Sequence, residues 1–96
     1  MHYYWVAYDI RHNRTRRLVA KWCKQAGLLR IQRSVFAGRS SPDRIREMEE
    51  QASGLLAPHD RLGIVPLDRT AWQNLLLLGD NPGKAALSRN EPVRYF

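Results

Sequence analysis

A chain of 96 residues, of which 44% are hydrophobic and 26% charged, can form one small folded domain and has no room for a second core. Its single cysteine excludes an internal disulfide and a multi-cysteine metal cluster, which agrees with a reducing compartment. No apolar run approaches the ~20 residues of a membrane-spanning helix, and the N-terminus lacks the pattern of a signal peptide. We therefore expect a cytoplasmic protein with no membrane partner.

Basic residues are concentrated in the first part of the chain. Residues 1–39 contain nine Lys or Arg side chains and one acid, Asp9, whereas residues 40–96 contain seven basic and eight acidic side chains. Thirteen of the 16 basic residues are arginines, and a guanidinium can donate two parallel hydrogen bonds to a phosphate. The pattern predicts a polyanionic partner, with nucleic acid as the first choice. The alternative is a basic protein whose charges are only solvated.

The first predicted element is a strand over residues 3–10, which are rich in aromatic and β-branched side chains. Both alternating sets of its side chains are apolar, so we expect this strand to be covered on both faces. Asp9 lies at its C-terminal end.

A helix is expected next, over residues 15–26, with Asn13 or Thr15 as the N-cap and Gly27 as the stop. Its apolar side chains recur at helical spacing and form one stripe. Basic side chains recur along another face: Arg14, Arg17, Lys21 and Lys24. We expect them to form a basic ridge on the outside of the helix.

Residues 27–39 are expected to contain either two short strands or one strand broken by a bulge near Arg33, and the sequence leaves both arrangements open. Ser41-Pro42 predicts the start of a second helix, because serine is a common N-cap and proline fits the first helical position. Pro58 is expected to end this helix.

The remaining apolar runs predict three strands, over residues 62–67, 73–78 and 93–96. The resulting order is the α+β ferredoxin-like motif βαββαβ with an extra C-terminal strand. Two helices cover only one face of such a sheet, so we expect a homodimer to cover the other. Residues 1–78 would form the domain, with its last strand exchanged between two copies, and residues 79–96 a tail.

Two sets of candidate residues follow from these patterns. The candidate nucleic-acid-binding residues are Arg11, Arg14, Arg16, Arg17, Lys21, Arg30, Arg33 and Arg39. The residues expected at the dimer interface are Tyr4, Val6, Phe36, Leu75 and Leu77. For Phe36, packing in the core or dimer competes with a role in stacking on a base.

Four segments carry a resemblance to a known family. They are Tyr8-Asp9-Ile10, Gly27-Leu28, the segment RIQRSVFAG from Arg30 to Gly38, and Ile64-Val65-Pro66-Leu67. Their order and spacing over about residues 3–78 resemble the CRISPR-associated protein 2 family. The resemblance implies a homodimer of ferredoxin-like protomers that acts in CRISPR spacer acquisition, where it binds the CRISPR integrase and duplex DNA.

Some members of that family resemble metal-dependent endonucleases of RNA or double-stranded DNA. The resemblance therefore makes Asp9 the candidate catalytic and metal-binding residue, with Mg²⁺ as the metal. A two-fold dimer would bring two Asp9 carboxylates together, and a bound ion would activate water. The alternative is that Asp9 pairs with Arg11 or Arg14 at the strand end. By motif position, Arg16, Arg30 and Phe36 also match functional residues of the family.

Three functions remain open at this point. The first is a dimeric scaffold for the integrase and DNA, which would bind phosphates without reading sequence. The second is a Mg²⁺-dependent endonuclease that cleaves RNA or DNA through Asp9 at the dimer axis. The third is a toxin-like ribonuclease on the same fold. Arg11 and His12 follow Asp9 where family members often carry acids or polar residues, which favours phosphate binding over metal binding.

Overall fold

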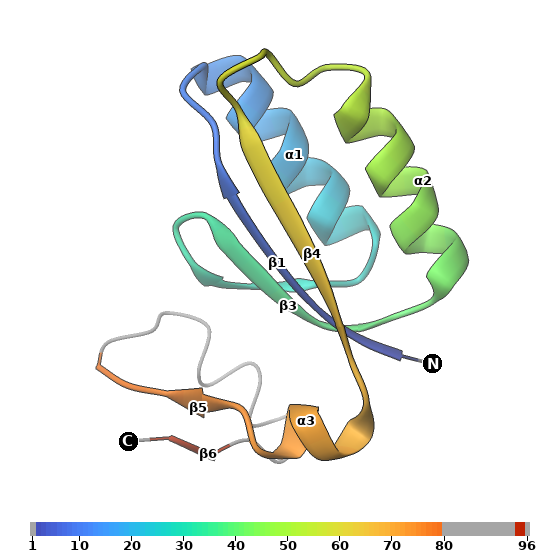
Figure 1. Ribbon diagram of the computed structural model, residues 1–96, viewed down its shortest axis with the longest axis vertical. Coiled ribbons are helices and arrows are strands. Elements are labelled where there is room, and N and C mark those ends of the chain that lie inside the picture. Colours follow the sequence, from blue (N-terminus) through green and yellow to red (C-terminus); the bar gives the residue numbers. More distant parts are fainter. Residues whose placement is uncertain (1, 80–93, 96) are drawn as a thin grey trace.

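The computed structural model describes residues 2–79 and 94–95 of the chain. Its elements, in chain order, are β1 (His2–Asp9), α1 (Asn13–Gln25), β2 (Leu29–Gln32), β3 (Val35–Ser40), α2 (Pro42–Ser53), β4 (Arg61–Leu67), α3 (Arg69–Gln73), β5 (Leu76–Leu77) and β6 (Arg94–Tyr95) (Figure 1). The first six elements follow the predicted βαββαβ order.

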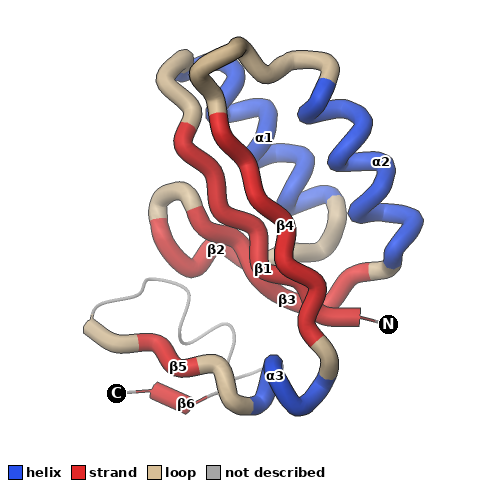
Figure 2. The backbone as a smooth tube through the Cα atoms, in the orientation of Figure 1, coloured by secondary structure: helices blue, strands red, loops and turns tan. Residues whose placement is uncertain are grey.

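The four long strands form one antiparallel sheet in the order β2-β3-β1-β4. The helices α1 and α2 lie side by side on one face of this sheet (Figure 2). On the other face, α3 and β5 pack against the sheet through Trp72 and Leu77. This arrangement confirms the α+β ferredoxin-like fold. The edge strand β4 contains Pro66, as expected for a strand with one unpaired side.

The main core lies between the sheet and the helices α1 and α2. Tyr4, Val6 and Tyr8 point from β1 into this core, where they pack with Phe36 of β3. Val6 and Phe36 are fully buried and Tyr4 is 7% exposed. The prediction that Tyr4, Val6 and Phe36 form the dimer interface is therefore wrong, because the two helices of the same chain already cover them. For Phe36, core packing is confirmed over base stacking.

The chain also covers part of the second sheet face by itself. Trp72 of α3 is 1% exposed and stacks on Tyr3, with 5.1 Å between the ring centroids. Leu77 is buried in the same cluster, and Leu75 packs against it. The expectation that only a second copy could cover this face is therefore wrong for the part formed by Tyr3, Ile31 and Ala37, which are all buried.

The strand predicted over residues 73–78 is shorter in the structure, because Gln73 belongs to the helix α3. The Asp68 carboxylate accepts a 2.7 Å hydrogen bond from the backbone N–H of Ala71 and caps α3, which ends at Gln73. Only Leu76 and Leu77 form a strand, which pairs in parallel with β6. The exchange of this segment between copies stays a prediction, and most of the predicted tail lies outside the described residues.

The hairpin of β2 and β3 answers the question that the sequence left open for residues 27–39. The region contains two strands, and their register shifts between Arg30 and Gln32. Gly27 adopts a φ of +94° after the last turn of α1, which agrees with its predicted role as the helix stop. The helix itself begins earlier than expected, with His12 in the N-cap position.

The second helix begins as predicted, but it ends at Ser53 with Gly54 as its C-cap, before the predicted end at Pro58. The Ser41 hydroxyl accepts a hydrogen bond from the backbone N–H of Arg44, and Pro42 occupies the first turn. No helix in the described part of the chain combines the length and the apolar character needed to cross a membrane.

The packing of Trp72 predicts a large stability effect. Trp72→Ala should lower the free energy of unfolding by about 3–5 kcal/mol, because it removes a buried ring and leaves a cavity against Tyr3. Leu55→Ala, at a side chain that is 41% exposed, should cost about 0.5 kcal/mol or less. Urea unfolding followed by circular dichroism measures both. Equal losses would mean that α3 does not hold the second face.

Candidate nucleic-acid interface

A basic hollow lies beside α1, next to the β2–β3 hairpin. Its volume is about 460 Å³. Its charged lining is entirely basic: Arg16, Arg17, Lys21, Lys24, Arg30 and Arg33. Ala20 and Gln25 complete the wall, so no carboxylate opposes these cations within the lining. A concave surface with one sign of charge concentrates anions, and this hollow is the strongest candidate binding site in the described chain.

Five of the eight predicted nucleic-acid-binding residues meet in this hollow, and three do not. Arg11 and Arg14 are exposed near the start of α1 and outside the lining. Arg39 lies on the opposite sheet face, where its guanidinium is 6.0 Å from the centre of the Tyr3 ring. The eight predicted residues therefore do not form one surface. Arg39 lies on the second sheet face because side chains alternate along β3, where Phe36 points to the helices and Arg39 points away from them.

Arg16 is held in place by the loop that enters α1. One terminal nitrogen donates a 3.2 Å hydrogen bond to the carbonyl of Ile10, and the other donates to the side-chain oxygen of Asn13. Both partners belong to the connection between β1 and α1 or to the first turn of the helix. Arg16 is half-buried as a result, and it joins the strand end to the helix start.

Arg30 is positioned by aromatic side chains. Its guanidinium carbon lies 5.1 Å from the centre of the Phe36 ring, a cation–π contact. Phe36 in turn stacks with Tyr8, with 6.4 Å between ring centroids. Arg30 also approaches the Tyr8 hydroxyl, although without normal hydrogen-bond geometry. Phe36 therefore contributes to the hollow indirectly, by positioning Arg30.

The groups beneath the hollow are neutral at ordinary pH. Burial raises the pKa of the Tyr8 hydroxyl, and Arg30 only partly opposes this effect. Burial also raises the pKa of the Cys23 thiol to about 12. Cys23 is fully buried, so it is not a nucleophile here, which agrees with its interpretation as core packing.

Asp9 lies at the exposed end of β1, opposite Arg61 of β4. Both border a shallow depression of about 490 Å³ on the second sheet face, with Ala7 and Gly63 as its small residues. The described residues supply no ion pair between Asp9 and Arg11 or Arg14, so the proposed pairing at the strand end is not found there.

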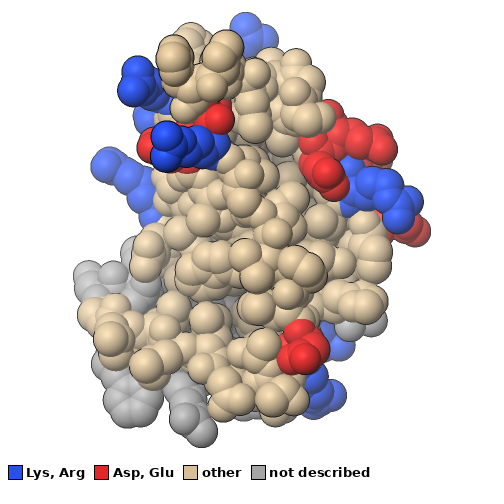
Figure 3. Space-filling model, viewed as in Figure 1, with Lys and Arg blue, Asp and Glu red and all other residues tan. Residues whose placement is uncertain are grey.

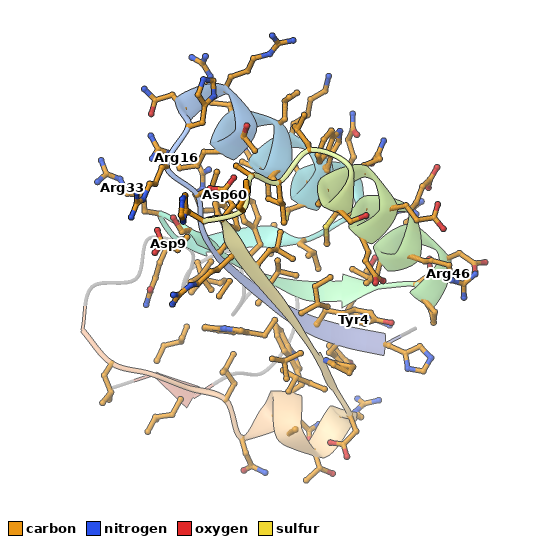
Figure 4. All side chains as sticks on the ribbon, turned by 45° about the horizontal axis from the view of Figure 1, so that its top comes forward. Tyr4, Asp9, Arg16, Arg33, Arg46 and Asp60 are labelled. Atoms are coloured by element: carbon orange, nitrogen blue, oxygen red, sulfur yellow. The ribbon has the colours of Figure 1, made fainter. Side chains whose placement is uncertain are left out.

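Asp9 and the hollow share one end of the sheet but face opposite sides of it. Arg30 and Phe36 belong to the face that the helices cover, whereas Asp9 follows Ala7 on the other face. Figure 4 shows Asp9, Arg16, Arg33 and Asp60 grouped at this end, with Tyr4 and Arg46 well away from it. Within one chain, the candidate metal ligand and the candidate phosphate-binding side chains thus do not form a single pocket.

Asp60 comes directly before Arg61, the residue that pairs with Asp9, and its carboxylate already has a structural role. Its two carboxylate oxygens accept hydrogen bonds from the backbone N–H groups of Arg11, at 3.4 Å, and Ala57, at 2.9 Å. Among the described residues, no group of three or more His, Cys, Asp or Glu side chains could hold a metal ion. Within the described part of one chain, Asp9 is a single carboxylate opposite Arg61, which does not by itself fit Mg²⁺.

The two main helices carry opposite charge. The stretch of α1 that lines the hollow is basic, whereas α2 contains Asp43, Glu47, Glu49 and Glu50. Figure 3 shows these acids gathered over α2, and it shows the middle of the sheet face without charged side chains. A polyanion approaching the helix layer would therefore be attracted to α1 and repelled by α2.

Two residues of these sites were not among the predicted site residues. Lys24 lines the hollow; its helical spacing from Arg17 and Lys21 placed it in the predicted basic ridge, but it was not included among the eight candidate nucleic-acid-binding residues. Arg61 lies opposite Asp9 on the neighbouring strand. No local sequence pattern predicts this neighbour, because it depends on the pairing of β1 with β4.

The comparisons with known proteins point to one family. The family model described as CRISPR associated protein Cas2 matches residues 1–75. The chain is similar to the CRISPR-associated endoribonuclease Cas2 2 of Pyrobaculum aerophilum, with 36% identity over 78 residues, 80% of this chain and 86% of the relative.

Solved structures share the fold. A hypothetical protein of Thermus thermophilus superposes with a TM-score of 0.71 and 30% identity, over 84% of this chain and 94% of that one. A chain in a structure titled as a partial Cas6-RT-Cas1–Cas2 complex matches with a TM-score of 0.59 and 24% identity, over 78% of this chain and 88% of that one.

The contacts of Arg16 predict a structural cost that its neighbour does not share. Arg16→Ala should lower the free energy of unfolding by about 1–2 kcal/mol, because it removes two hydrogen bonds between the loop and the helix start. Arg17→Ala, one residue further along and exposed, should change it by about 0.5 kcal/mol or less. Thermal and urea unfolding measure the difference, and equal stability of the two variants would contradict the positioning role of Arg16.

Proposed function

The chain belongs to the CRISPR-associated protein Cas2 family, and we propose that it serves CRISPR adaptation as a dimeric scaffold that holds duplex nucleic acid beside the CRISPR integrase. The observation that carries this proposal is the hollow beside α1, whose six charged side chains are all basic. Contacts of this kind bind the phosphate backbone and position a duplex without reading its sequence.

The dimer is proposed from the part of the second sheet face that α3 leaves open. Val65 is 49% exposed there, and Trp5 is half-buried. The middle of this face carries no charged side chain (Figure 3). A second copy would remove these apolar groups from water. The exchange of residues 73–78 belongs to the same proposal: Leu77 would leave its own cluster, and the segment would pair with the free edge of β4 in the partner.

The integrase is proposed as the protein partner from family membership. One solved structure with this fold bears a title that names Cas1 together with Cas2. The acidic surface of α2 lies away from the basic hollow, so a protein could bind this chain without competing with nucleic acid for the same charges.

Nuclease activity is the second candidate function, and a specific observation favours it. Asp9 is exposed beside an open depression, and its carboxylate forms no hydrogen bond or ion pair with the described residues. A curated relative at 36% identity is named an endoribonuclease. A single protomer does not fit Mg²⁺, so this activity would require two copies that bring their Asp9 carboxylates together.

The scaffold proposal predicts duplex binding with strong salt dependence and no sequence preference. Replacing Arg17 and Lys21 together by Gln should weaken binding to all duplexes alike. The slope of log K against log salt should become shallower by roughly 2, about 0.9 for each lost phosphate contact. Fluorescence anisotropy at several salt concentrations measures both effects.

Arg46→Gln is the matched control for this experiment, because Arg46 is an exposed cation on α2 that pairs with Asp43 at 3.5 Å. It should leave the affinity and the slope unchanged. If the double variant binds as tightly as the parent at low salt, the hollow is not a phosphate-binding surface.

The second candidate predicts a separation of activities at Asp9. Asp9→Asn should abolish any Mg²⁺-dependent cleavage of RNA or DNA and leave dimerisation, duplex affinity and integrase-supported integration intact. The exposed position of Asp9 makes a folding defect unexpected. Cleavage of labelled strands, light scattering and an integration assay give the three readouts. Cleavage retained in the variant would assign the activity to another site, and loss of integration would contradict a purely architectural role.

A further inference from the structure

The basic hollow differs from an ordinary charged surface because its chain has already oriented two of its arginines. Arg16 is tied to Ile10 and Asn13, and Arg30 lies over the Phe36 ring. A side chain that is ordered before binding loses less conformational entropy when a ligand arrives. The other four cations are exposed and surround this ordered pair.

Both oriented arginines retain donors for a ligand. A guanidinium has five N–H groups, and Arg16 uses two of them within the chain. The Arg30 guanidinium lies over the Phe36 ring, and a ring contact does not use up its N–H donors. Both side chains line the hollow. The site therefore presents several fixed donors from two walls, one formed by α1 and the other by β2.

The hollow is open to solvent and can admit a phosphate that projects into it. A volume of about 460 Å³ falls in the range of pockets that take small ligands. The phosphates along a duplex each carry one negative charge and lie on a convex surface. A terminal phosphate carries about −1.5 to −2 charges and three acceptor oxygens, so it matches several donors in a recess better than a bridging phosphate does.

We propose that the hollow between α1 and the β2–β3 hairpin is a seat for a terminal phosphate group, with Arg16 and Arg30 as its fixed donors. The group has two sources, the phosphorylated end of a strand and a free nucleotide, which present the same chemistry. This proposal deepens the proposed function and rests on it for the strand end, whereas the free-nucleotide arm is independent of it.

The test compares two short blunt duplexes of identical sequence, one with 5′-phosphates and one with 5′-hydroxyls. The phosphorylated duplex should bind roughly tenfold more tightly, as expected for a few added charge-assisted hydrogen bonds. Arg30→Gln should bring this ratio close to one. Arg30→Lys keeps the charge but loses the planar fork, so it should lower the ratio and also serves if Arg30→Gln folds poorly.

Arg39→Gln is the matched control, because Arg39 belongs to the same hairpin and also lies over an aromatic ring, but on the other sheet face. It should leave the ratio at its parental value. Adding AMP, with adenosine as its control, separates the two sources. Displacement by AMP alone assigns the seat to free nucleotides as well, and a ratio that AMP does not affect assigns it to strand ends.

Two results would overturn the proposal: equal affinity of the parent protein for both duplexes, or a ratio that Arg30→Gln and Arg30→Lys both leave unchanged. If neither duplex binds, the proposed scaffold function fails. The seat is then judged by calorimetry with AMP against adenosine in the parent and Arg30→Gln proteins. AMP binding that the variant loses would support the seat, and no AMP binding would overturn it.

Discussion

The whole molecule depends on one strand that must be buried on both faces. β1 lies between β3 and β4 and presents apolar side chains to both sides. The helices α1 and α2 cover one side, and Trp72 with Leu77 covers part of the other. Because alternate residues face opposite sides, a shift of one residue would exchange the two cores. The position of Asp9 at the strand end follows from this register.

The same register places the charged side chains that nucleic acid would meet. Two arginines at the end of the sheet make contacts within the chain itself. Arg16 joins the loop to α1, and Arg30 lies over Phe36. Their orientation is a consequence of folding, so stability and binding are coupled in this hollow. Lys21 and Arg33 have no such internal contacts in the described chain, and they add charge with little cost to the fold.

The separation of Asp9 from the hollow limits what one copy can do. A carboxylate that lies opposite Arg61 on one side of the sheet and a basic hollow on the other side do not make a single catalytic pocket. Binding of a polyanion needs only the recess. Metal-dependent chemistry needs a second carboxylate, which within the described residues only another copy of the chain would supply. This difference favours an architectural role for the isolated fold.

The sequence by itself determined β1, the two main helices and β4. The alternating apolar residues of β1, the Ser41-Pro42 helix start and the Gly27 stop depend on local chemistry, so they could be predicted without knowledge of the fold. Tertiary structure decided the rest. It turned Phe36 into the core, placed Arg39 on the opposite face from Arg30, and used Trp72 to cover Tyr3. Those outcomes depend on which strands pair and in which register, and strand pairing joins residues that no local pattern connects.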